Sequence, residues 1–209
     1  SKFQKEIFLG KEYTVLKGTL RKRADYDDAW LLALAQEAKI VFDVGCNIGQ
    51  SSLLMMHSNN IQEILLVDPN PLALGKAANN FIFNELSENA RFICAFVSDE
   101  SDQKVAFFTV GAGAAGSVYP DHAKTASNMD IKYDVSTTTV DALVRKFGII
   151  PDLVKIDTEG AETLVLNGTK SVASHRKTQF LVEMHSNIEL PMIRNATKVI
   201  QWCEENMYQ

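Results

Sequence analysis

Residues 39–52 of the chain read Lys-Ile-Val-Phe-Asp-Val-Gly-Cys-Asn-Ile-Gly-Gln-Ser-Ser, and this stretch decides the fold. Residues 39–43 are a short apolar run that ends in an acid, which is typical of a strand buried on both faces of a sheet. Gly45 and Gly49 let the backbone turn tightly, and residues 50–57 have the pattern of a helix. The stretch therefore predicts a strand, a glycine-containing loop and a helix in direct succession.

The same alternation of buried strands and helices extends outward from this stretch. Asn70 and Pro71 suit the cap and first turn of the helix that follows the second strand. We predict strands at residues 63–67, 91–96, 153–157 and 179–185, and helices at residues 26–37, 71–86, 139–147 and 191–206. Alternation over this length predicts an α/β fold, Rossmann-like, with a mostly parallel sheet covered by helices on both faces.

Two segments lie outside this alternation. Residues 6–16 predict a small hairpin around Gly10. Residues 104–136 predict an inserted β segment, whose end at Ser136 and Thr137 is expected to cap the next helix. We expect a single domain overall, in which residues 1–38 form an N-terminal hairpin and helix that pack on a core of residues 39–209.

The composition narrows the class of protein. The chain has 209 residues, of which 46% are hydrophobic and 22% charged, as in ordinary globular proteins and unlike disordered ones. No apolar run approaches the ~20 residues of a membrane-spanning helix. The formal net charge of −5 provides no general attraction to phosphate backbones, so no nucleic-acid partner is expected.

The cysteines and the N-terminal residues indicate the compartment. The three cysteines are an odd number without a Cys-x-x-Cys pair, which argues against a zinc ribbon and a redox dithiol. A reducing environment fits this usage better than a secreted disulfide scaffold. The first residues lack the long apolar core of a signal peptide. We therefore expect a cytoplasmic protein.

Polar and glycine residues follow the first three strands of the predicted core sheet. Ligands of such sheets bind at the carboxyl ends of the strands. Asp68 can accept hydrogen bonds from both hydroxyls of a ribose, and Ser98 is expected to meet an adenine edge. The candidate cofactor residues are Asp43, Gly45, Asn47, Gly49, Ser51, Asp68 and Ser98. Together they predict a nucleoside cofactor that lies across the first three strand ends.

The loop pattern indicates which nucleoside cofactor is bound. The loop departs from the dinucleotide pattern Gly-x-Gly-x-x-Gly and fits Asp-x-Gly-x-x-x-Gly, which suits S-adenosylmethionine better than a pyrophosphate. Residues 111–116 do match the dinucleotide pattern letter for letter, but Pro120 follows and no amphipathic helix is apparent. We interpret residues 111–116 as a flexible loop, either a substrate gate or a simple connection.

An ordered set of motifs resembles the FkbM family of S-adenosylmethionine-dependent methyltransferases. The motifs lie at residues 41–52, 67–71, 136–141 and 154–162, and the most specific is Lys-Ile-Asp-Thr-Glu-Gly-Ala-Glu at 155–162. The resemblance implies a class I methyltransferase fold and methylation of oxygen on small molecules such as sugars or natural products. It also implies cofactor roles for Asp43, Gly45, Asn47, Gly49 and Asp68.

The resemblance has one departure. Class I methyltransferases usually finish with two further strands, whereas this sequence stops directly after its last predicted helix. We therefore expect the C-terminal strands to be missing, either because the C-terminus is not part of this sequence or because the sheet is shortened. A shortened sheet would expose an edge, which makes a homo-oligomer a possible arrangement.

The reaction chemistry is expected at the ends of the fourth and fifth strands. Methylation of a hydroxyl needs alignment of the acceptor and removal of its proton. Alternation along the strands places Asp157 opposite His185, so we predict catalytic roles for Asp157, His185 and Glu159. A divalent metal on the same residues is the alternative, although no metal is expected.

Three neighbouring acids and bases are expected to be structural. Lys155 and Glu183 should form a buried ion pair one step deeper than Asp157. Glu162 should be the first-turn acid of a helix, where it favours the helix dipole.

Two rival functions remain open. One is an NAD-dependent oxidoreductase on a similar sheet, although the loop departs from its fingerprint and no Tyr-x-x-x-Lys pair follows the fourth strand. The other is a non-catalytic nucleoside-binding domain. We favour a methyltransferase that acts on a small-molecule substrate.

Overall fold

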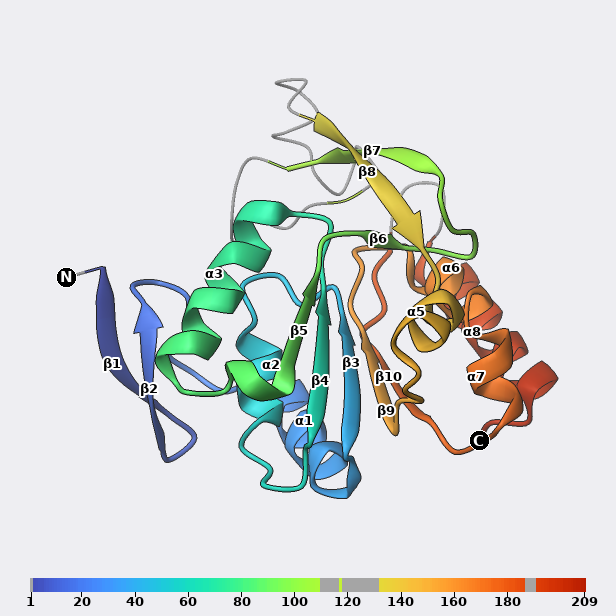
Figure 1. The fold of residues 1–209 in the computed structure, drawn as a ribbon. Helices are drawn as coiled ribbons and strands as arrows, with labels where there is room; N and C mark the ends of the chain where they lie inside the picture. Colours follow the sequence, from blue (N-terminus) through green and yellow to red (C-terminus); the bar gives the residue numbers. More distant parts are fainter. Residues whose placement is uncertain (1, 110–116, 118–131, 187–190) are drawn as a thin grey trace.

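A five-stranded parallel sheet forms the centre of the molecule, in the order β10-β9-β3-β4-β5 (Figure 1). The computed structural model describes residues 2–109, 117, 132–186 and 191–209. The strands of the central sheet are β3 (Ile40–Val44), β4 (Glu63–Val67), β5 (Ala90–Ile93), β9 (Leu153–Ile156) and β10 (Gln179–Val182). The predicted parallel sheet is thus confirmed. The third strand is shorter than predicted, because Phe96 and Val97 leave the central sheet and pair elsewhere.

Helices cover both faces of the central sheet (Figure 1). On one face lie α1 (Tyr26–Glu37), α2 (Gln50–Met55) and α3 (Pro71–Phe83). On the other lie α5 (Val140–Phe147), α6 (Glu162–Asn167), α7 (Lys170–Ser174) and α8 (Met192–Asn206). Successive strand residues alternate between the two cores, so that Val41 packs under the first helix layer and Phe42 under the second. This burial on both faces explains why the strands read as continuous apolar runs.

Capping residues in the sequence determine where two of the helices begin. The side chain of Asn70 accepts the backbone N–H groups of Leu72 and Ala73, and Pro71 is the first residue of α3, as predicted. The cap of α5 is Thr139, whose hydroxyl accepts the N–H of Ala142 at 3.0 Å. The prediction that Ser136 and Thr137 cap this helix is wrong, because both still belong to a strand.

A second, three-stranded sheet lies beyond the carboxyl ends of the central strands (Figure 1). It contains β6 (Phe96–Val97), β7 (Lys104–Phe108) and β8 (Lys132–Thr138), in the order β6-β8-β7. Its small core joins Phe96 and Phe107 to Ala161 at the start of α6. The predicted β segment is thus present, whereas residues 111–116 lie outside the described residues.

The N-terminal hairpin pairs β1 (Phe3–Phe8) with β2 (Lys11–Leu16), as the sequence predicts. Two asparagines, one in α3 and one at its C-cap, hold the second strand of the hairpin. Oδ1 of Asn80 accepts the N–H of Leu16 at 2.8 Å, and Oδ1 of Asn84 accepts that of Thr14 at 2.9 Å. A short 3-10 helix, η1 (Ser87–Asn89), precedes β5. No helix in the described part of the chain combines the length and apolar character needed to cross a membrane.

Candidate functional site

The glycine-containing loop after β3 is held between two other elements. Gly45 and Gly49 have φ values of 82° and 80°, in the left-handed region that glycine adopts readily. A Cβ atom on Gly45 would lie 1.8 Å from the carbonyl oxygen of Asp157, and one on Gly49 would lie 2.8 Å from Cβ of Ala77. The loop therefore needs glycine at both positions to pack against β9 and α3.

Asp43, in β3 just before the loop, holds the loop in place through hydrogen bonds to the helix that follows it. Its fully buried carboxylate accepts hydrogen bonds from the hydroxyls of Ser51 and Ser52 in the first turn of α2. Its other oxygen, Oδ1, lies 3.6 Å from Nζ of Lys155. Among the described residues that line the two cavities below, Asp43 is absent and Ser51 is present. Asp43 therefore shapes the loop, and a direct contact between Asp43 and a cofactor stays a prediction.

Asp68 follows β4 and is only 7% exposed. Its two oxygens accept the backbone N–H groups of Asn47 and Asn70, each at 2.8 Å. Burial raises the pKa of Asp68 to about 6, against the opposing effect of these hydrogen bonds. Asp68 thus ties the loop after β3 to the cap of α3 and presents its carboxyl group at the strand ends.

A cavity opens where β3, β4 and the segment after β5 end. Asp68, Asn47 and Asn70 supply polar groups to its wall. Ala95, Phe96, Val97 and Phe107 supply its apolar wall, and Ser98 is not among the described residues that line it. The side-chain oxygen of Asn47 is buried and has no hydrogen-bond partner among the described residues. An apolar wall, an acid and an unpaired amide oxygen fit a nucleoside that carries a ribose and an amino group.

A second cavity lies on the other side of the glycine loop. It is lined by the start of α1 and by the ends of β9 and β10, including Arg21, Asp25, Asp28, Lys155 and Glu183. Gly45, Asn47 and Asp157 line both cavities. The two cavities therefore meet at the loop after β3 and the end of β9.

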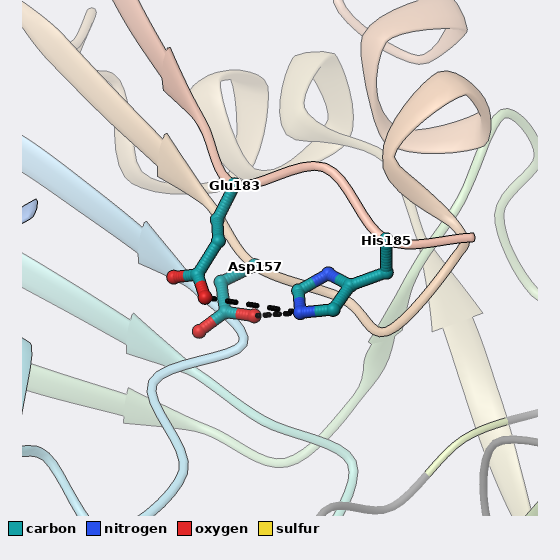
Figure 2. Close-up of side chains that lie close together, drawn as sticks. All are labelled: Asp157, Glu183 and His185. Atoms are coloured by element: carbon teal, nitrogen blue, oxygen red, sulfur yellow. Dashed lines mark ion pairs between the residues drawn. The ribbon is translucent and has the colours of Figure 1, made fainter. Parts of the chain in front are cut away.

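Asp157, Glu183 and His185 converge at the ends of β9 and β10 (Figure 2). Nε2 of His185 lies 3.8 Å from a carboxylate oxygen of each of Asp157, Glu183 and Glu159. Strand alternation predicted the approach of Asp157 to His185, and the structure places Glu159 beside them. Burial and the charge of Asp157 raise the pKa of Glu183. The catalytic roles of the three predicted residues stay predictions.

The expected pair of Lys155 with Glu183 is wrong. Nζ of Lys155 donates to Oδ2 of Asp157 at 3.0 Å and lies close to Asp43. The cause is register: Lys155 is directly opposite Asp43 on β3, whereas its opposite residue on β10 is Leu181. Burial favours a neutral amine, but the carboxylates of Asp43 and Asp157 outweigh it and raise the pKa of Lys155.

Glu162 and Asn195 fix the orientation of His185, and no sequence pattern connects either residue with it. Its Nδ1 lies 3.1 Å from Oε1 of Glu162, which is fully buried and also accepts the N–H of Gly160 at 2.9 Å. Nδ2 of Asn195 on α8 donates to Oε2 of Glu162 at 3.2 Å and to the backbone oxygen of His185 at 2.7 Å. Glu162 is the first residue of α6, as predicted, yet it also anchors His185.

The protonation of this pair follows from the geometry. The hydrogen bond to Glu162 is the largest influence on His185 and raises its pKa to about 9, against the effect of burial. Burial alone would raise the pKa of Glu162, but the hydrogen bonds from His185 and Gly160 outweigh it and lower that pKa. With no cation bound, these pKa directions favour the imidazolium form of His185, paired with a buried carboxylate.

The fold is that of a class I methyltransferase, and a cavity lies at the carboxyl edge of its parallel sheet. Residues 43–209 match the family model described as the methyltransferase FkbM domain. The chain therefore belongs to the FkbM family of S-adenosylmethionine-dependent methyltransferases, as its motifs predict. No curated protein matches the sequence.

Two solved structures share the fold. Methyltransferase FkbM from Methylobacillus flagellatus KT aligns with a TM-score of 0.55 and 12% identity over 82% of this chain. A SAM-dependent methyltransferase from Agrobacterium tumefaciens aligns with a TM-score of 0.53 and 13% identity over 100% of this chain. The chain spans 37% and 59% of the lengths of these two proteins.

Proposed function

We propose that this chain binds S-adenosylmethionine in the cavity at the ends of β3 and β4 and transfers its methyl group to a hydroxyl oxygen of a small molecule in the second cavity. The observation that carries the proposal is that Asp157 lines both cavities. A residue in this position faces the donor on one side and the acceptor on the other.

On the donor side, the residues of the chain bind and orient the cofactor. Asp68 accepts hydrogen bonds from the ribose hydroxyls, and Phe96, Val97 and Phe107 enclose the adenine. The side-chain oxygen of Asn47, which is buried without a described partner, can accept a hydrogen bond from the amino group of the cofactor. When bound, S-adenosylmethionine supplies an activated methyl group on its sulfonium.

Where the two cavities meet, Asp157 positions a hydroxyl group and takes up its proton, and Glu159 assists from the wall of the first cavity. His185 does not act as the base at neutral pH, since its pKa is raised to about 9 by Glu162 and the ring already holds the proton. Instead, the charged ring supports the nearby carboxylates electrostatically. Alignment of the acceptor and proton removal are the contributions that the reaction requires from the chain.

Two features favour this function over its rivals. The loop after β3 has Asn47 and Gln50 where the dinucleotide pattern has glycine, which disfavours NAD. A non-catalytic nucleoside-binding domain would not need ionisable groups from β9 and β10 beside the cavity, yet four converge there in Asp157, Glu159, Glu183 and His185. Acids in the second cavity also favour a neutral or cationic substrate, such as a sugar-like polyol, over an anionic one.

Calorimetric titration with S-adenosylmethionine and, separately, with NAD tests the proposal. We expect binding of S-adenosylmethionine only, and Asp68→Ala should weaken it by about 1.5–3 kcal/mol, the usual contribution of hydrogen bonds to a charged group. Asp134→Ala removes an exposed acid of β8 and should leave the affinity unchanged. If Asp68→Ala binds as tightly as the unmodified chain, the assignment of the ribose site is wrong.

A further inference from the structure

We propose that Asp157, Glu183 and His185 form a binding site for a divalent cation of the Mg²⁺ or Mn²⁺ type (Figure 2). One ligand atom from each of the three residues lies within 4.8 Å of the others. The residues follow the neighbouring strands β9 and β10, so the sheet itself sets their spacing. Cation binding does not depend on the proposed function, whereas its role in methyl transfer rests on it.

The ring of His185 is aimed by groups outside the proposed ligand set. Nδ1 is engaged by the fully buried Glu162, and the backbone oxygen of His185 is held by Asn195. The ring therefore presents Nε2 to Asp157 and Glu183, as Figure 2 shows. A bound cation takes the place of the proton on Nε2, while the proton on Nδ1 stays in the hydrogen bond to Glu162, so binding releases one proton to solvent. Histidine ligands of metals typically engage a carboxylate with their other nitrogen, which fixes the orientation of the ring.

The separations around Nε2 suit ligands that share one ion. The oxygens of Asp157 and Glu183 each lie 3.8 Å from Nε2, beyond the ~3.2 Å of a normal hydrogen bond. An octahedral ion with bonds of about 2.1 Å holds its ligands roughly 3–4 Å apart. The same carboxylate of Asp157 contacts Lys155 through Oδ2, so its Oδ1 is the oxygen that faces the ring.

The charge around the site favours a cation. Within the described part of the chain, the carboxylates of Asp157, Glu159, Glu162 and Glu183 all lie within 4 Å of the His185 ring. Lys155 is shared between Asp157 and Asp43, so it does not offset this charge alone. A set of oxygen ligands with one imidazole suits Mg²⁺ or Mn²⁺, whereas zinc prefers more nitrogen and sulfur.

The location connects the cation to the reaction. Asp157 lines the donor cavity and Asp157 and Glu183 line the second cavity. A cation held here contacts the acceptor cavity at its junction with the donor cavity. A hydroxyl that binds this cation loses its proton more readily, so under the proposed function the cation both orients and activates the acceptor.

Titration of the metal-free chain with Mn²⁺, followed by electron paramagnetic resonance, tests the site without any cofactor or substrate. We expect one Mn²⁺ per chain, with a ¹⁴N coupling from His185 in the pulsed spectrum. Glu183→Gln should weaken binding at least about tenfold. Glu162→Gln, which weakens the hold on the ring and removes one nearby negative charge, should weaken binding by about 10–100-fold. Glu183 is half-exposed, so its variant is expected to fold.

Glu88→Gln, in the exposed 3-10 helix before β5, is the matched control and should bind Mn²⁺ unchanged. The proposal is overturned if the unmodified chain binds no Mn²⁺, if the ¹⁴N coupling is absent, or if all variants bind equally. Titration of the same metal-free preparation with S-adenosylmethionine separates the two proposals. Cofactor binding without Mn²⁺ binding overturns only the cation site, and the reverse result overturns only the cofactor assignment.

Discussion

Asp68 is a buried acid whose protonation is expected to control cofactor binding. Burial raises its pKa to about 6, and the nearby charges of Asp43 and Lys155 act in opposite directions. Above this pH the group is a carboxylate, which under the proposed function accepts hydrogen bonds from the ribose hydroxyls. Below it the group gains a proton and loses the charge. We therefore expect the affinity for S-adenosylmethionine to be constant above about pH 7 and roughly tenfold lower at pH 5.

Calorimetry across this pH range measures the effect, and Asp68→Asn provides the control because its amide does not titrate. Cys94 and Tyr133 also lie near Asp68, but burial raises the pKa of both above their usual alkaline values, so neither titrates in this window. A variant with the same pH dependence as the unmodified chain would assign the effect to another group.

Gly45 is a residue for which the smallest side chain is essential. Alanine at this position would place Cβ 1.8 Å from the carbonyl oxygen of Asp157 and would keep a φ of 82°. We expect Gly45→Ala to lower the free energy of unfolding by more than about 1–3 kcal/mol, as strained backbone positions do. Urea denaturation measures this loss.

Gly75 is the matched control, since it lies on the exposed face of α3 with nothing within 4 Å of a built Cβ. Gly75→Ala should stabilise the chain by about 0.5–1 kcal/mol, because alanine loses less entropy in a helix. Similar stabilities for the two variants would show that the loop after β3 relaxes around a larger residue.

At the scale of elements, Asn195 joins α8 to α6 and to the end of β10. It is fully buried, and its amide donates to Glu162 and to the backbone of His185. Asn195→Ala removes both donors and leaves buried acceptors, so we expect a loss of about 1–3 kcal/mol in the free energy of unfolding. Thr197→Ala, exposed on the same helix, should stay within about 0.5 kcal/mol of the unmodified chain. Equal effects of the two changes would contradict the joining role.

The elements that local patterns determine were predictable from the sequence. The strands β3 and β4 are uninterrupted apolar runs, and Asn70 with Pro71 marks the start of α3. Phe96 was misassigned to the third strand because an apolar residue suits either sheet, and only the pairing with β8 decides between them. A threonine suits a helix cap and a strand equally well, so the local sequence does not predict that Thr137 belongs to β8.

The sequence predicts only those parts of the site whose residues come directly after strands of the central sheet. The glycine loop and Asp68 come directly after strands, so their meeting follows from a parallel sheet. The pair of Lys155 with Asp43 depends on the register between β9 and β3, which the sequence does not state. Phe107 enters the cavity from the inserted β segment, and Asn195 reaches Glu162 from the last helix. No local sequence pattern predicts either of these contacts.

At the scale of the whole molecule, the presence of two cavities means that one substitution can change the rate of methyl transfer without changing the affinity for the donor. Asp157→Asn keeps the shape of the side chain and removes its charge, while Asp68 and the apolar wall of the donor cavity stay unchanged. We expect unchanged affinity for S-adenosylmethionine and a methyl-transfer rate lower by about 10²–10⁴ under single-turnover conditions. Equal losses of affinity and rate would place Asp157 in donor binding alone. An unchanged rate would remove it from the chemistry.

Under the proposed function, the close approach of Gly45 to the carbonyl group of Asp157 also bears on the distance between the two reactants. Gly45 and Asp157 both line the two cavities, and at this point the glycine presents only hydrogen atoms to the carbonyl group. A bulkier residue would push the loop after β3 away from the end of β9, and under the proposed function this would move the donor away from Asp157. Because a misplacement of about 1 Å can slow a reaction by about 10²-fold, we expect the rate of methyl transfer to be sensitive to the size of this residue.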